Sequence, residues 1–588
     1  MLFSTAIISK VQKGGLCLRE AAYRTLVIGS GCAGLNAADT LAARGEKSLL
    51  LVTEGMNCGT SRNTGSDKQT YYKLSLGGDE ADSVGELARS LAYPDVNGDN
   101  ALCEAASSAA CFFKLCALGV PFPVNEFGEY VGYQTDHDTR RRATSAGPLT
   151  SRYMTEALEA SVRARRIEIL DRALAARIVT DKTGVAALDV YLKEEKEWMR
   201  IRCANVVLCT GGPAHIYQDR VYPESQHGMS GLALEAGAEG ANLDCWQYGL
   251  ASVKFRWNLS GSYQQVIPRY ISVDDKGTER EFLADALGET QAIAFTFLKG
   301  YQWPYDAYKV PGSSQVDILV KAENDLGRHV YLDYRHNPRG WSWDNLSAEA
   351  AAYLKNSGAT QETPFERLCT MNEPAIRLYL DHGIDLEKEP LEIRVCAQHH
   401  NGGIAVDSHW QTCVPGLYVC GEAAGTFGRK RPGGSALNST QVGSMRAAEH
   451  IMTNQRTISS ASLPFLPFSL PSGNPEAFRK EMTRIAAFQR ESIGMRKLKA
   501  LVESALSCTS FKTDDIPQAL LLKDLLLTQR AVLSAMLFAA EEQSNACGVL
   551  MTSAAGSTRV PARPIPERDL WFENVWKKNR ERQQGVNR

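Results

Sequence analysis

Three glycines near the start of the sequence have the spacing of a phosphate-binding turn. Gly29, Gly31 and Gly34 follow a β-favouring run, 23–28, and precede a helix-like run rich in alanine and leucine, 35–44. Glycines at these positions allow a tight bend, close approach of a pyrophosphate to the backbone, and packing of helix on strand. The helix N-terminus would face the phosphates with unpaired N–H groups. We predict a dinucleotide site formed by Gly29, Ser30, Gly31, Cys32, Ala33 and Gly34.

A carboxylate stands where contact with a ribose is expected. The apolar run 47–53 has the composition of a strand buried on both faces, and Glu54 directly follows it. A carboxylate there can accept hydrogen bonds from ribose hydroxyls and disfavours a 2′-phosphate. Because strand, turn, helix and carboxylate occur in the required order, an ordinary tight turn is the weaker alternative.

Three later segments combine short apolar runs with glycine turns. Two of them, 205–209 and 416–420, have the composition of strands, and 431–450 has that of a helix. The turns beside these segments contain Thr210, Gly211, Gly212, Gly421, Glu422, Gly434, Ser435, Ala436 and Leu437. Together with the first turn, these motifs resemble the flavoprotein family of fumarate reductase, succinate dehydrogenase and L-aspartate oxidase.

The resemblance runs in patches from about residue 23 to about residue 450 and implies that the dinucleotide is FAD. In this family the Thr-Gly-Gly turn lies close to the cofactor, and the Gly-Glu turn contacts its ribityl region. A helix N-terminus meets the flavin pyrimidine edge and stabilises the negative charge of the reduced ring. The loop that carries a covalent flavin histidine in relatives has no histidine here, so we predict non-covalent FAD. The residues of that loop expected to contact the flavin are Thr60, Ser61, Arg62, Asn63, Thr64 and Gly65.

The resemblance also implies a reaction, the transfer of a hydride between flavin N5 and a carbon next to a carboxylate. Arg431 matches the family's substrate-binding arginine, and its guanidinium fork suits a carboxylate. His399 and His400 precede a Gly-Gly turn that resembles the family's histidine segment. This chain is one residue shorter there, so either histidine could face the substrate.

Two segments depart from the family pattern. The family's Gln-Phe-His-Pro-Thr segment is 247–250 here and lacks the histidine and the threonine, and Val266 occupies the position of the proton-donating arginine. Arg269 could donate the proton only from a shifted backbone. Tyr248 or Tyr270 could serve instead, because a nearby cation lowers the pKa of a phenol. These departures disfavour a C4-dicarboxylate substrate.

Three functions remain open at this point. The leading hypothesis is reduction of an activated C=C bond, or the reverse dehydrogenation, on a small carboxylate-bearing molecule. The second is an oxidase of the L-aspartate oxidase kind, and the third is an FAD-bearing electron-transfer subunit without its own substrate. A cationic pocket of Arg431 with His399 or His400 argues against the third function. The missing proton-donor arginine argues for it.

The length of the chain requires several domains, because 588 residues exceed what one hydrophobic core supports. We predict an α/β fold with three parts. A Rossmann-like FAD-binding domain covers 22–244 and 390–455, an inserted α+β capping domain covers 245–389, and a helical C-terminal domain covers 460–588. In the last domain, Asp515 is the expected N-cap of a long helix.

Charge and composition narrow the range of partners. Lys and Arg number 65 against 67 Asp and Glu, which gives no long-range attraction for nucleic acid or an anionic membrane. No apolar run approaches the roughly 20 residues needed to span a bilayer. The 15 cysteines, mostly in apolar runs, are typical of buried thiols in a reducing compartment. We expect a cytoplasmic protein with a small-molecule substrate and no metal site, and a separate electron-transfer partner remains open.

Overall fold

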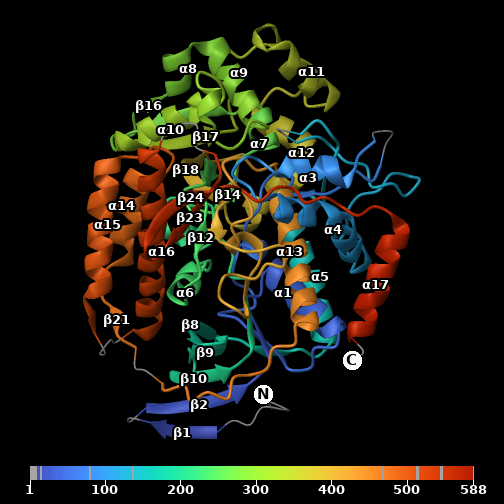
Figure 1. Ribbon diagram of the computed structural model, residues 1–588. Helices are drawn as coiled ribbons and strands as arrows, with labels where there is room; N and C mark the ends of the chain where they lie inside the picture. The colour runs from blue at the N-terminus through green and yellow to red at the C-terminus, as the bar shows by residue number, and fades with distance from the viewer. Residues whose placement is uncertain are drawn as a thin grey trace.

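A parallel five-stranded sheet forms the centre of the molecule. The computed structural model describes residues 9–13, 16–77, 81–135, 138–465, 468–510, 515–542 and 547–586 (Figure 1). The strands, in spatial order, are β20 (Leu417–Val419), β11 (Asn205–Leu208), β3 (Thr25–Ile28), β4 (Leu49–Val52) and β7 (Glu168–Leu170). All four neighbouring pairs are parallel. The strand order confirms the α/β class and joins sequence segments almost 400 residues apart.

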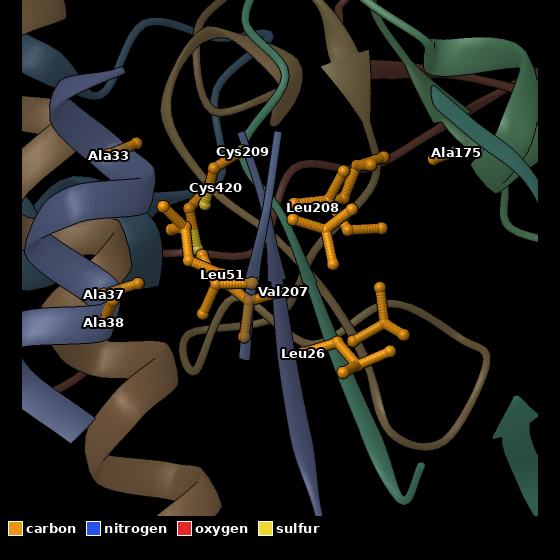
Figure 2. Packing of buried hydrophobic residues seen from close by; sticks show 14 of the residues in the cluster. Leu26, Ala33, Ala37, Ala38, Leu51, Ala175, Val207, Leu208, Cys209 and Cys420 are labelled. Carbon is orange, nitrogen blue, oxygen red and sulfur yellow. The ribbon is translucent and has the colours of Figure 1, made fainter. Parts of the chain in front are cut away.

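The first helix packs against this sheet through small side chains. Helix α1 (Cys32–Ala43) follows β3 directly, and Ala33, Ala37 and Ala38 are buried. Figure 2 shows these alanines pointing from α1 toward the strands that carry Leu51 and Val207. Small side chains let the helix lie close to the sheet, so its N-terminus lies beside the carboxyl ends of the strands. Three more helices contact α1 or each other on this side: α4 (Gly98–Ala117), α5 (Thr150–Ala164) and α13 (Ser435–Thr453).

A second sheet, of mixed strand direction, lies at the bottom of the view in Figure 1. Its strands, in spatial order, are β1 (Ser9–Lys13), β2 (Leu16–Ala22), β10 (Glu197–Arg202), β9 (Gly184–Leu192) and β8 (Ala173–Asp181). Strand β2 pairs with β10 in parallel, and the other pairs are antiparallel. Strand β1 and nearly all of β2 therefore lie outside the predicted domain boundary at 22.

The inserted segment is built on a six-stranded sheet covered by helices. The strands, in spatial order, are β14 (Trp257–Asn258), β13 (Trp246–Ser252), β18 (Leu391–His400), β17 (His329–Asp333), β15 (Arg269–Val273) and β16 (Glu279–Arg280). The helices of the insert are α7 (Ser262–Gln265), α8 (Phe282–Leu287), α9 (Glu289–Lys299), α10 (Gln315–Asp325), α11 (Ala348–Asn356) and α12 (Pro364–Asp381). Strand β18 begins just after the predicted boundary at 389, yet it pairs with β13 and β17. Strand β18 therefore belongs to the sheet of the insert, and its C-terminal end holds His399 and His400 beside the FAD-binding segment.

Three antiparallel helices dominate the C-terminal part: α14 (Pro475–Ala486), α15 (Ser492–Ser507) and α16 (Ile516–Glu541) (Figure 1). The Asp515 side chain accepts a hydrogen bond from Gln518 N, which confirms the predicted N-cap. The part is not purely helical, because β23 (Val549–Ser553) and β24 (Gly556–Val560) form a hairpin. This hairpin extends the small sheet of β12 (Gly240–Ala241) and β19 (Gly403–Ile404). The last helix is α17 (Phe572–Val586).

Candidate active site

One large cavity opens at the carboxyl ends of the parallel strands and extends toward the insert. Its volume is about 280 Å³. We name it the central cavity. The predicted residues that line it are Gly29, Ser30, Gly31, Cys32, Ala33, Glu54, Thr60, Ser61, Thr64, Gly65, Thr210, Gly211, His399, Gly421, Glu422, Arg431, Ala436 and Leu437. The fold thus brings one cavity together from segments spread over more than 400 positions of the sequence.

The glycine turn between β3 and α1 has the geometry of a phosphate cradle. Gly29 has φ +109°, and a Cβ on Gly34 would overlap the carbonyl oxygen of Gly29. Gly31 is the N-cap of α1 and supplies no side-chain cap, so the helix N-terminus faces the cavity with N–H groups to donate. Gly29 and Gly34 therefore allow strand, turn and helix to pack closely, and a Cβ on Gly31 would lie 3.2 Å from Ser61 Oγ, which belongs to the cavity lining. The turn therefore fits the dinucleotide that the sequence predicts.

Glu54 lies at the far end of the central cavity between two basic side chains. Its carboxylate accepts a hydrogen bond from Lys193 Nζ at 3.0 Å and contacts His227 Nδ1 at 2.8 Å. Burial opposes ionisation of this carboxyl, but His227 and Lys193 outweigh burial and lower its pKa to about 2. Glu54 is therefore an anion over the whole physiological range, as an acceptor for ribose hydroxyls should be.

Sequence reasoning missed the loop that closes this end of the cavity. Ser225, Gln226, His227 and Met229 line it, and Gln226 donates hydrogen bonds to the carbonyls of Thr210 and Gly212. The loop has no motif of its own. Its role is revealed only by its contacts with the Thr-Gly-Gly turn and with Glu54, which is 173 positions away in the sequence.

Several predicted contact residues lie beside the cavity without lining it. Arg62 is paired with Glu159 at 2.5 Å, and Asn63 Nδ2 donates to the carbonyl of Asn57 at 2.8 Å. Ser435 Oγ lies 3.3 Å from Arg431 Nη1. Gly34, Gly212 and Gly434 likewise shape turns whose neighbours line the cavity.

Glu422 presents a buried carboxyl to the cavity. It accepts hydrogen bonds from the Tyr222 hydroxyl and, at 2.9 Å, from His400 N. Burial raises its pKa to about 7 against the effect of these donors. The carboxyl is therefore partly protonated near neutral pH and supplies only part of a negative charge to its surroundings.

Arg431 is a buried guanidinium without a carboxylate partner. Its Nη2 donates to Gln247 Oε1 at 2.7 Å and its Nε donates to Asn401 Oδ1 at 3.3 Å, both neutral amides. No described carboxylate lies within ion-pair distance of it. Burial lowers its pKa to about 10, which still leaves it fully charged at neutral pH. A buried cation held by neutral groups on the wall of a cavity is suited to an anionic ligand.

The structure distinguishes the two adjacent histidines. His399 lines the central cavity, and its Nε2 has no hydrogen-bond partner among the described residues, since Glu422 Oε1 lies 3.9 Å away. His400 faces the other way, stacks on Trp246 with ring centroids 4.1 Å apart, and contacts the Leu243 carbonyl. Alternation along β18 separates the two side chains, so only His399 is placed to meet a ligand in the cavity.

The tautomer of His399 follows from its neighbours. Asn401 Nδ2 donates to the Gly428 carbonyl at 2.8 Å, so the amide oxygen of Asn401 faces His399 Nδ1 at 3.0 Å. An amide oxygen can only accept, so Nδ1 carries the proton and Nε2 presents a lone pair to the cavity. Burial and the charge of Arg431 hold the pKa of His399 well below its usual range, which keeps the ring neutral.

The candidate proton donors from the sequence do not reach the cavity. Arg269 is on β15 and pairs with Glu279 at 2.6 Å, Glu281 at 2.8 Å and Asp333 at 3.6 Å, so its guanidinium is fully engaged within the insert. The Tyr248 hydroxyl contacts the Tyr217 hydroxyl at 3.0 Å on the opposite face of β13. Tyr270 is buried and donates to Gln264 at 2.7 Å. Arg269, the candidate that required a shifted backbone, therefore lies away from the central cavity.

A family comparison agrees with this cavity. A model described as the FAD binding domain matches residues 24–437 of the chain. The chain belongs to this FAD-binding family. It is an FAD-dependent oxidoreductase of the fumarate reductase, succinate dehydrogenase and L-aspartate oxidase type, which confirms the resemblance drawn from the motifs.

Two relatives illustrate the range within the family. L-aspartate oxidase of Streptomyces coelicolor is 26% identical over 444 residues, which are 72% of this chain and 68% of that protein. A fumarate reductase (CoM/CoB) chain of Methanothermobacter marburgensis is 26% identical over 326 residues, 54% of this chain and 52% of that protein. The two relatives carry different names at the same identity, so the family alone does not assign a substrate to this chain.

Solved structures share the whole fold. A quinol-fumarate reductase chain with menaquinol superposes with a TM-score of 0.68 at 18% identity, covering 94% of this chain and 99% of that chain. The Mycobacterium smegmatis Sdh1 complex gives the same TM-score of 0.68 at 18% identity, covering 93% and 96%. Within the described residues, no helix has the length and apolar character needed to cross a bilayer. Those same residues also contain no cluster of three or more potential metal ligands.

Proposed function

We propose that this flavoprotein transfers a hydride between non-covalent FAD and a small molecule whose carboxylate binds Arg431. The observation that carries the proposal is that one cavity holds the guanidinium of Arg431, which has no carboxylate partner among the described residues, and the Nε2 of His399, which has no hydrogen-bond partner there. An electron-transfer subunit without a substrate needs neither group. The geometry therefore favours an enzyme over a carrier.

The proposed cofactor contacts are those of the glycine cradle and its surroundings. Backbone N–H groups at the start of α1 would hold the pyrophosphate, and Glu54 would hold the adenosine ribose. Glu422 would face the ribityl chain, and the α13 N-terminus with Ala436 and Leu437 would face the flavin. When bound, FAD supplies the two-electron hydride chemistry of the reaction.

The chain's own residues bind and orient the substrate. Gln247, Asn401, Ser435 and the Pro432 carbonyl hold the guanidinium of Arg431 and leave one N–H of Nη2 without an acceptor among the described residues. A carboxylate would bind this N–H and replace the two 3.3 Å contacts of Nη1. His399 cannot donate to that carboxylate, because its Nε2 is an acceptor. It instead accepts a hydrogen bond from a group next to the carboxylate, and its lowered pKa makes it a weak base for taking the proton itself.

A second candidate function follows from the same tautomer. An acceptor beside a carboxylate-binding arginine suits the amino or hydroxyl group of a 2-amino or 2-hydroxy acid. Oxidation of a C–N or C–O bond, as in an enzyme of the L-aspartate oxidase kind, is therefore the alternative to dehydrogenation of a C–C bond.

The testing experiment compares the two directions under anaerobic conditions. Flavin absorbance of the FAD-loaded protein is followed while saturated acids, 2-amino acids and 2-hydroxy acids are added to the oxidised form, and unsaturated acids are added to the reduced form. Loss of the oxidised-flavin absorbance on adding an acid, or its recovery in the reduced form, identifies the reaction class. A flavin that responds to dithionite but to none of these acids would favour the carrier role.

Arg431→Lys tests the carboxylate site directly. Lysine keeps the charge but loses the fork, so the substrate dissociation constant should rise about tenfold or more, since each charge-assisted hydrogen bond contributes about 1.5–3 kcal/mol. FAD content should stay normal. The matched control is Arg377→Lys on α12, where the side chain is 70% exposed. Unchanged substrate affinity in the Arg431 variant would refute the assignment.

Partners and compartment are proposed on indirect grounds. The cysteines from Cys32 to Cys508 that the structure describes form no disulfide with one another, and many are buried, which supports a reducing compartment such as the cytoplasm. The solved relatives include flavoprotein chains of multi-subunit complexes, which supports a separate electron-transfer partner. The proposed domains are an FAD-binding domain at 22–244 and 390–455, a capping domain at 245–389 and a C-terminal domain at 460–588.

A further inference from the structure

Trp303 reaches the central cavity from the insert, where the sequence suggested no binding residue. It follows α9, and it lines the cavity together with His399 and Arg431. Its indole Nε1 is buried and has no hydrogen-bond partner among the described residues. The segment around it is fixed, because Tyr305 N donates to the Tyr248 carbonyl at 2.8 Å. An indole N–H can only donate a hydrogen bond, so the N–H of Trp303 is available to an acceptor on a bound ligand.

The position of the indole depends on a glycine. A Cβ on Gly249 would overlap Trp303 Nε1 and lie 3.0 Å from its Cδ1. Gly249 stands where the resembled family pattern has histidine, in Gln247-Tyr248-Gly249-Leu250. The missing side chain on β13 thus makes the space that the tryptophan of the insert occupies. The indole of Trp303, from another element, therefore takes the place that the family pattern gives to an imidazole.

Trp303 and Arg431 face the cavity from neighbouring positions. Gln247 and Gly249 are two residues apart on β13, while Tyr248 between them points to the opposite face. Gln247 holds Arg431, and Gly249 lies under Trp303. Two residues of a strand span roughly 7 Å. The two strand positions that contact the guanidinium and the indole are therefore about 7 Å apart, close to the length of a short carbon chain.

The surroundings of Trp303 are neutral. Among the described residues that line the central cavity, Arg431 is the only arginine or lysine. Two further lining residues near Gly249 are amides that bind each other, with Asn258 Nδ2 donating to Gln398 Oε1 at 2.9 Å and Gln398 Nε2 donating to the Gly249 carbonyl at 2.8 Å. A carboxylate placed there would lose its hydration without meeting a cation.

We propose that Trp303 is a specificity residue that donates a hydrogen bond to a neutral acceptor at the end of the substrate remote from its carboxylate. The site then selects monocarboxylates that carry an ester, amide or ketone oxygen and excludes dicarboxylates. This inference rests on the proposed function, in which Arg431 binds the one carboxylate.

The test measures binding to the FAD-loaded protein by isothermal titration calorimetry, with monomethyl fumarate, fumarate and crotonate as probes. Monomethyl fumarate should bind at least tenfold more tightly than fumarate. Trp303→Phe keeps the ring and removes the N–H, so monomethyl fumarate should weaken about fivefold to tenfold while crotonate, which lacks the second acceptor, should not change. Trp303→His restores a ring donor and should recover part of the loss. Trp343→Phe, in the same insert but 37% exposed, is the matched control.

Three outcomes separate the inference from the proposed function. Fumarate binding as tight as its monoester would overturn the inference, and so would an equal loss of crotonate and monoester affinity in Trp303→Phe, which indicates packing alone. Failure of all three probes to bind in an Arg431-dependent manner would instead overturn the proposed function. If Trp303→Phe does not fold, the comparison of fumarate with its monoester in the unaltered protein still decides.

Discussion

Glu54 shows at the residue scale how charge partners define a binding group. Replacement by Gln keeps the shape but removes the charge from hydrogen bonds worth about 1.5–3 kcal/mol each, so FAD affinity should fall about tenfold or more. The replacement also leaves Lys193 and His227 facing a neutral amide. Equilibrium titration of apoprotein with FAD measures the change. Unchanged affinity would place the ribose contact elsewhere.

The same residue predicts a dependence on pH. The pKa of Glu54 falls from an ordinary 4.5 to about 2 in the folded protein. Its stabilising contribution is therefore fully present above about pH 4.5 and is lost as the pH falls toward 2. The unfolding free energy of the wild type should fall over this pH interval because of Glu54, and that of Glu54→Gln should lack this part of the fall. The difference in unfolding free energy between the two proteins should shrink over that interval.

At the scale of the element, the turn between β3 and α1 is sensitive to a single methyl group. In Gly34→Ala the new Cβ would overlap the Gly29 carbonyl, so α1 must move away from the strand. We expect loss of FAD from the purified protein and a lower melting temperature. Gly45→Ala is the comparison variant, because a Cβ there meets nothing within 4 Å, so its φ of +94° contributes backbone strain without a clash and without a contact to the cavity. Normal FAD content in Gly34→Ala would show that the turn tolerates the shift.

Elements with a strong local pattern could be predicted, and those set by distant contacts could not. The runs around β3, α1 and β4 have the periodicity and glycine spacing of a βαβ unit, so their order and the cradle followed from the sequence. The cavity-lining roles of His227 and Trp303 arise from loops that meet Glu54 and Gly249 only in the fold. No local pattern marks such residues. Arg269 was predicted to reach the site and does not. Its three carboxylate partners come from other positions in the insert, and no local pattern in the sequence indicates them.

For the whole molecule, the mode of cofactor attachment has a direct test. The 59–66 loop offers hydroxyl, amide and guanidinium groups but no histidine, so the flavin should be held by non-covalent contacts alone. Acid precipitation of the yellow protein should release the flavin into the supernatant, where fluorescence identifies it as FAD. Colour that stays with the pellet would contradict non-covalent binding, and colourless protein that takes up no FAD would contradict the cofactor itself.

The interleaving of the central sheet also has a consequence for biosynthesis. Strand β20 and the start of α13 complete a sheet and a cavity whose first strand is β3, and roughly 400 residues separate Gly29 from Gly421. At about 5–20 residues per second, a ribosome needs roughly 20–80 s to make that stretch. Strand β11 is made about half-way through this stretch, so for roughly 10–40 s before β20 follows its edge is unpaired and is a template for aggregation. The nascent chain should therefore depend on chaperones until its last third emerges, and FAD loading should follow translation rather than accompany it.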